Sequence, residues 1–137
     1  MMDRVNGADA DRVAADIVRF ARRMIGVVTS PTGLVVCCFL KAGIVLPEEL
    51  LALHREGERV VGSDLLAADL IFRTGRRDAF HPGDQRYGIG HVGIYSGEHT
   101  VLHASLSEGC VSEDLIDAFF DAENGHFRGT RRIIART

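Results

Sequence analysis

Residues 91–105 read HVGIYSGEHTVLHAS, and this segment holds two short apolar runs with one histidine in each. The runs are His91–Tyr95 and Thr100–Ala104, and the polar residues Ser96–Glu98 lie between them. Valine, isoleucine and tyrosine favour strands, and a glycine in a short connection is typical of a tight turn. The segment therefore predicts a β-hairpin.

The register of this hairpin determines how its two histidines are placed. A turn with Gly97 at its left-handed position predicts that paired residue numbers sum to 194. His91 then stands directly opposite His103, with Cβ atoms roughly 5 Å apart. A slip by one residue would send the two rings to opposite faces. A second interpretation stays open, in which each imidazole only meets a buried backbone carbonyl.

Around the hairpin, the second half of the chain has three more strand-like segments, namely Asp69–Phe72, Gly109–Val111 and Arg131–Ile134. A short helix is expected at 115–120. The segment Arg73–Gly90 has 18 residues and is rich in Gly, Asp, Arg and His. A loop of this length within a compact domain is more often functional than idle.

The first half of the chain predicts helices instead. Apolar residues recur at spacings of three and four across 9–25. Ser30 is suited to an N-cap and Pro31 to the first helical position, which predicts a second helix over 31–42 that Gly43 ends. This second helix is apolar on every side, so we expect it in the interior.

A short surface helix is expected at 48–55. Helices followed by strands predict an α+β fold, with the buried helix packed on an antiparallel sheet. The composition of the 137 residues, 46% apolar and 26% charged, is that of one average globular domain, here expected to span 1–137.

Net charge and hydropathy limit the kinds of partner and location that the chain is expected to have. The net charge is −3 and no basic stripe precedes the last residues, which argues against a nucleic-acid partner. The sequence contains no run of 18 apolar residues, so no membrane span is expected. The beginning of the chain lacks the apolar run of a signal peptide, and a cytoplasmic location is expected unless a leader was removed.

Neither a metal nor a cofactor is expected. The three cysteines are Cys37, Cys38 and Cys110, two of them adjacent, so they cannot all pair and are expected to be reduced thiols. The acidic and histidine side chains of the long loop are Asp78, His81 and Asp84. Their spacing, even with the two hairpin histidines added, matches no zinc-binding motif.

The order of these segments resembles the NlpC-type cell-wall cysteine peptidases, which are papain-like enzymes. The family pattern runs (P)GDLVFF, HVGIY and (F)IHAS, and the matching segments here are Leu66–Phe72, His91–Tyr95 and Val101–Ser105. The resemblance covers roughly residues 15–134. It implies that His91 is the general base, that His103 orients it, and that peptides of the bacterial cell wall are the substrate class.

The cysteine nucleophile of the family does not carry over. In the family, a cysteine within DCSG(L/F)V begins the buried helix, and an AGI.LP segment follows 12 residues later. Here AGIVLP is present at 42–47, and counting back from Gly43 places Pro31 of SPTGLV at the nucleophile position. A proline has no nucleophilic atom. The hydroxyls of Ser30 and Thr32 are more simply explained by helix capping.

Cys37 is the alternative nucleophile. It lies two turns inside the predicted helix, about 9–10 Å further along the axis than position 31. At that depth the helix dipole no longer lowers a thiol pKa. Cys38 is a weaker candidate, and Cys110 is assigned to packing.

Two hypotheses follow. We favour a domain that binds a cell-wall peptide, or another small peptide, and has lost catalysis. The alternative is an active cysteine amidase or endopeptidase that uses Cys37 with His91 and His103. A Cys37 sulfur within about 4 Å of a His91 ring nitrogen would support the enzyme. The sequence predicts no particular oligomeric state.

Overall fold

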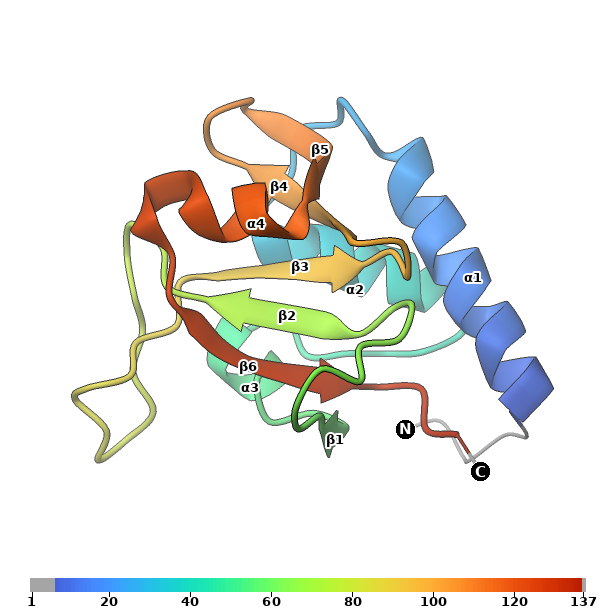
Figure 1. The fold of residues 1–137 in the computed structure, drawn as a ribbon, viewed down its shortest axis with the longest axis horizontal. Coiled ribbons are helices and arrows are strands. Elements are labelled where there is room, and N and C mark those ends of the chain that lie inside the picture. Colours follow the sequence, from blue (N-terminus) through green and yellow to red (C-terminus); the bar gives the residue numbers. More distant parts are fainter. Residues whose placement is uncertain (1–6, 137) are drawn as a thin grey trace.

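Residues 7–136 are the part of the chain that the computed structural model describes, and within them three helices precede all of the strands (Figure 1). The helices are α1 (Gly7–Arg23), α2 (Pro31–Lys41), α3 (Leu50–Leu53), α4 (Ile116–Asp121) and the 3-10 helix η1 (Ala122–Asn124). The strands are β1 (Glu58–Arg59), β2 (Leu70–Arg73), β3 (His91–Tyr95), β4 (Thr100–Ser105), β5 (Cys110–Leu115) and β6 (Phe127–Arg132). They pair antiparallel in the order β1-β6-β2-β3-β4-β5. The expected α+β fold is confirmed.

Helices cover both faces of this sheet. In Figure 1, α2 lies behind the sheet, α1 runs along its right-hand side, and α4 lies in front of it. The larger core joins α1, α2 and α3 to the far face, and its buried members include Ile17, Leu34, Phe39, Leu53, Phe72 and Ile94. A smaller core lies under α4 and consists of Ile71, Tyr95, Val101 and Phe119.

Helix α2 begins and ends close to the predicted positions. The side chain of Ser30 accepts a hydrogen bond from the Gly33 amide at 3.0 Å, which makes Ser30 the N-cap, and Pro31 is the first helical residue. The helix ends at Lys41, and Gly43 follows with a φ of +85°. Helix α2 is therefore the buried helix that the sequence predicts, one residue shorter than the expected 31–42.

Three other predicted elements are displaced. The first helix occupies 7–23 rather than 9–25, the surface helix is reduced to α3, and the last strand is 127–132 rather than 131–134. Strand β1 was not predicted because two exposed polar residues carry no hydrophobic pattern.

The predicted hairpin forms, but its register of 194 is wrong. Ile94 pairs with Leu102 and Tyr95 with Val101, so paired numbers sum to 196. The turn is shifted by one residue and comprises Gly97–His99, where Gly97 has a φ of +93°. Because the shift in the sum is two, the histidines still share one face.

Gly93 explains how the rings meet in this register. His103 lies opposite Gly93 and diagonal to His91, not directly opposite it. A Cβ atom on Gly93 would come within 2.3 Å of Val101 Cγ1 and 3.2 Å of His103 Cβ. The missing side chain leaves room for the His103 ring to reach the His91 ring.

Candidate functional site

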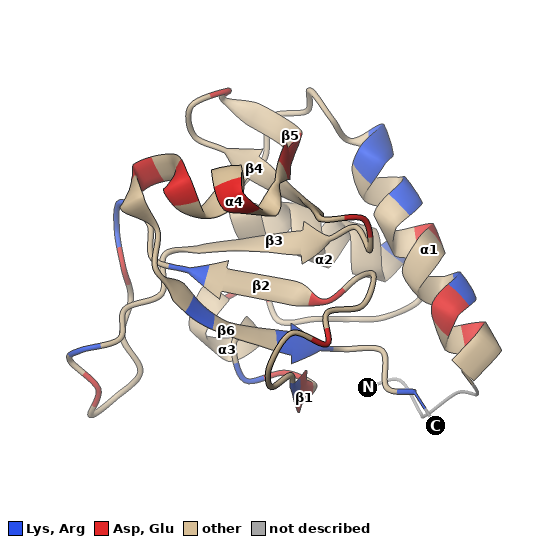
Figure 2. Cartoon of the chain, viewed as in Figure 1, with Lys and Arg blue, Asp and Glu red and all other residues tan. Residues whose placement is uncertain are grey.

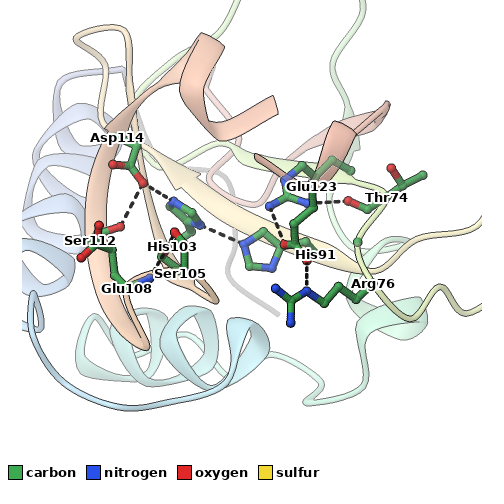
Figure 3. A network of polar contacts seen from close by, with 12 residues as sticks. Thr74, Arg76, His91, His103, Ser105, Glu108, Ser112, Asp114 and Glu123 are labelled. Atoms are coloured by element: carbon green, nitrogen blue, oxygen red, sulfur yellow. Dashed lines mark hydrogen bonds and ion pairs between the residues drawn. The ribbon is translucent and has the colours of Figure 1, made fainter. Parts of the chain in front are cut away.

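His91, His103 and Asp114 form a hydrogen-bonded chain across three neighbouring strands. His91 Nε2 lies 2.9 Å from His103 Nδ1, and His103 Nε2 lies 2.7 Å from Asp114 Oδ2 (Figure 3). Ser112 donates a further hydrogen bond to the same carboxylate oxygen at 3.0 Å. The three residues come from β3, β4 and β5 in that order.

The carboxylate sets the proton positions along this chain. An ionised carboxylate only accepts, so His103 donates from Nε2 to Asp114. In its neutral form His103 then accepts at Nδ1, and His91 donates to it from Nε2. His91 Nδ1 is thereby left with a free lone pair, and it has no hydrogen-bond partner within residues 7–136.

The two imidazoles are held in a nearly dry environment by helix α4. His91 and His103 are each only 2% exposed. The Phe119 ring stacks on His91 at 5.6 Å between centroids and meets His103 edge-on at 5.0 Å. Burial lowers the pKa of His91 to about 3, with the nearby Arg73 adding to the effect, and burial also lowers the pKa of His103. Both rings are therefore neutral at physiological pH.

Arg73 is a buried cation beside the histidine pair. It is 1% exposed, and its guanidinium lies 4.9 Å from the centre of the Phe119 ring. It pairs with Glu123 at 3.5 Å and donates to the carbonyl of Thr74, and Arg76 contacts the other Glu123 oxygen at 2.7 Å (Figure 3). Its Nε atom has no hydrogen-bond partner within the described residues.

The link that leads into α2 is hydrogen-bonded to strand β5. Gly26 donates to the carbonyl of Val111 at 2.9 Å, and Val111 donates to the carbonyl of Val27 at the same distance. Val111 is paired with Ala104, the neighbour of His103. The link before Pro31 is thus fastened to β5.

The cysteines lie elsewhere. Cys37 is half-buried inside α2, whose packed residues contact the sheet face opposite the one with Phe119. Within residues 7–136, Cys37 makes no hydrogen bond to either histidine. Cys38 is buried, lies 3.7 Å from the Met24 sulfur, and burial raises its pKa to about 11.

The acidic residues and the histidine of the long loop do not join the histidine pair. Asp78 accepts from the Gly75 amide, Asp84 accepts from the Arg86 and Tyr87 amides, and His81 contacts His54. Within residues 7–136 no group of three or more His, Cys, Asp and Glu side chains is arranged to hold a metal ion. No helix in the same range has the length and apolar content to cross a membrane.

Sequence reasoning missed several residues around the histidines, namely Asp114, Ser112, Phe119, Glu123 and the burial of Arg73. Asp114 could have been found from the strand alternation, because it follows Ser112 at a spacing of two on one face of β5.

Comparisons with known proteins agree on one family. The model of the NlpC/P60 family matches residues 30–126. A probable endopeptidase of Corynebacterium glutamicum is 35% identical over 86 residues, which are 63% of this chain and 35% of that protein. The match thus spans about a third of the curated relative.

Solved structures share the fold. The peptidoglycan hydrolase RipB of Mycobacterium tuberculosis superposes with a TM-score of 0.72 at 22% identity, covering 96% of this chain and 69% of that one. The P60 domain of an antigen from Mycobacterium avium subspecies paratuberculosis gives 0.72 at 19% identity, covering 93% and 98%. An NlpC/P60 family protein of Bacillus cereus gives 0.71 at 20% identity, covering 89% of this chain and 40% of that one.

Proposed function

Because the chain belongs to the NlpC/P60 family, whose model matches residues 30–126, we propose that it binds a peptide of the bacterial cell wall and does not cleave it. The observation that carries this proposal is Pro31 at the first position of α2, where the family pattern has its cysteine. A pyrrolidine ring has neither a thiol nor an N–H, so it cannot attack a carbonyl.

The histidine pair gives the proposed binding site its chemistry. Neutral His91 offers the Nδ1 lone pair as a hydrogen-bond acceptor, and its ring is fixed by His103 and Phe119. Peptide amides present N–H donors, so we assign His91 Nδ1 to a backbone amide of the ligand. A fixed acceptor loses little conformational entropy on binding, which favours affinity without any reaction.

Cys37 is the nucleophile in the alternative function, an active cysteine amidase or endopeptidase. The position of Cys37 in α2 argues against this enzymatic function. Position 37 is six residues after Pro31, so its side chain is rotated by about 120° from that of residue 31 and shifted by about 9 Å along the helix. A thiol at position 37 therefore lies in a different place and points in a different direction from a cysteine at the helix start.

Isothermal titration with L-alanyl-γ-D-glutamyl-diaminopimelate tests the binding proposal. We expect saturable binding that His91→Phe weakens at least ten-fold, because the amide of the ligand loses its acceptor. His99→Ala is the matched control, since His99 is exposed in the turn of the same hairpin. Absence of binding, or equal binding by the His91 variant, would refute the proposal.

Alkylation separates the two functions. Iodoacetamide at neutral pH should label the three thiols slowly, because an activated thiolate is not expected among them. Mass spectrometry of tryptic peptides locates the label. Fast labelling confined to Cys37 would favour the cysteine amidase instead.

A further inference from the structure

A hollow lies away from the histidine pair. It has a volume of about 420 Å³ and is formed by the end of α3, by β1 and β6, and by the loop around 81–89. His54, on its wall, packs edge-on against Phe72 of the larger core, whereas His91 faces Phe119 across the sheet. The volume lies in the range of small-molecule sites, roughly 300–1,000 Å³.

Two arginines in this hollow are placed against each other. Arg59 of β1 is the direct cross-strand partner of Arg131 of β6, and both line the hollow. Like charges directly opposite each other destabilise a strand pair. Within residues 7–136 neither guanidinium has a hydrogen-bond or ion-pair partner. An anion seated between them would offset this repulsion.

The other side of the hollow is formed by His54, His81 and Arg128, and hydrogen bonds hold these side chains in place. His54 Nε2 donates to the Arg128 carbonyl at 2.7 Å, so His54 Nδ1 accepts from His81 Nε2 at 2.9 Å. The Arg128 guanidinium donates to the Gly88 carbonyl at 3.1 Å and lies 5.4 Å from the centre of the Tyr87 ring. These side chains are positioned before any ligand arrives.

The charge of the lining selects the kind of ligand. Three arginines, Arg59, Arg128 and Arg131, and one carboxylate, Asp84, line the hollow, so the arginines exceed the carboxylate by two charges. Figure 2 shows basic residues along β6, in contrast to the acidic residues along α4. A phosphate carries about −1.5 to −2 charges at neutral pH and has three oxygens that can accept from two guanidinium groups.

We propose that this hollow binds a small organic phosphate. The phosphate group lies between Arg59 and Arg131, and the organic part lies against the Tyr87 and Phe127 rings that complete the lining. The site is independent of the histidine pair and of the cell-wall peptide assigned to it.

Titration of the full chain with pyrophosphate, at low and constant ionic strength, tests this assignment. We expect one saturable site, and Arg59→Gln and Arg131→Gln should each weaken binding about ten-fold or more, because each removes charge-assisted hydrogen bonds. Arg23→Gln is the control, since it removes the same charge from the exposed face of α1. Circular dichroism checks that each variant is folded.

Three results would overturn the proposal. The first is the absence of saturable binding, and the second is equal weakening by the Arg23 variant, which would indicate unspecific attraction of anions. The third is citrate binding as tightly as pyrophosphate, which would assign the hollow to carboxylates. Loss of pyrophosphate binding in the two pocket variants with unchanged peptide binding would support two separate sites.

Discussion

At the scale of single residues, His91 is defined by what surrounds each of its ring atoms. Its Nε2 atom donates to His103, its ring face stacks on Phe119, and Arg73 adds a positive charge close by. Burial contributes most to lowering the pKa of His91, and the nearby charges of Arg73 and His103 lower it further, so a second proton on the ring is disfavoured. The residue is therefore a neutral hydrogen-bond acceptor rather than a cation.

The protonation of His91 can be measured by nitrogen-15 NMR of the imidazoles. The pKa of His91 is lowered to about 3, so the ring should stay neutral, with its proton on Nε2, down to about pH 4. Between the unfolded pKa of about 6.5 and the folded value, the unfolded chain binds more protons, so stability should fall as the pH falls through this window. Exposed His99 is the internal reference. Titration of His91 close to pH 6.5 would contradict this environment.

Gly93 makes a second prediction at this scale. Gly93→Ala places a methyl group within 2.3 Å of Val101 Cγ1, so we expect a loss of about 1–3 kcal/mol in the free energy of unfolding. Gly7→Ala is the matched control, because nothing lies within 4 Å of a Cβ atom there. Urea denaturation measures both. An unchanged urea midpoint for Gly93→Ala would show that β3 and β4 accommodate the methyl group with no loss of stability, which would contradict the prediction.

Single residues differ in how well the sequence predicts them. The meeting of His91 with His103 followed from their parity within one hairpin. Asp69, the first residue of the strand-like segment Asp69–Phe72, has a structural role. Asp69 is 1% exposed and accepts from the Leu66 amide and from Arg132. Glu123 was missed because it gains its role only from Arg73 and Arg76, which are distant in sequence.

At the scale of elements, α2 is the best predicted part of the fold. Ser30 and Pro31 mark its beginning by local chemistry, and Gly43 follows its end with a positive φ. The hairpin was predicted less well. Its existence followed from two apolar runs, but its register depended on which turn residue takes the left-handed conformation, and both Gly97 and His99 do so.

The start of α2 makes a prediction about reactivity. Pro31→Cys should place a thiol where the first-turn amides and the helix dipole lower its pKa. We expect iodoacetamide to label this thiol at least ten-fold faster than Cys37 in the same chain, with Cys38 and Cys110 as further internal references. Equal rates at positions 31 and 37 would show that the helix start has no activating environment.

At the scale of the whole molecule, the sheet separates two sites. The histidine pair lies under α4 on one face, and the cationic hollow lies beside α3 and the β1–β6 edge. The sequence predicted the buried helix packed on an antiparallel sheet, because Ser30, Pro31 and Gly43 mark the ends of that helix, but it did not predict that α4 covers the other face. It did not predict the hollow, because Arg59 and Arg131 meet only through a strand pair with no hydrophobic pattern.

Arg132 of β6 forms an ion pair with Asp69, the residue directly before β2. It donates to both carboxylate oxygens of Asp69, at 3.0 and 2.8 Å. Arg132→Gln should cost about 2 kcal/mol of unfolding free energy, because it leaves a buried carboxylate with fewer donors. Arg131→Gln, one residue earlier, should cost nothing, since it removes a repulsion with Arg59. Equal losses in the two variants, measured by urea denaturation, would contradict this role.

The central question is whether a family member with proline at the helix start has lost hydrolysis. The direct test is to incubate the unaltered chain with L-alanyl-γ-D-glutamyl-diaminopimelate and to analyse the peptide by mass spectrometry. We predict that the peptide is recovered intact after prolonged incubation, even at concentrations that saturate binding. Release of diaminopimelate by the unaltered chain that is abolished in Cys37→Ser would contradict the account.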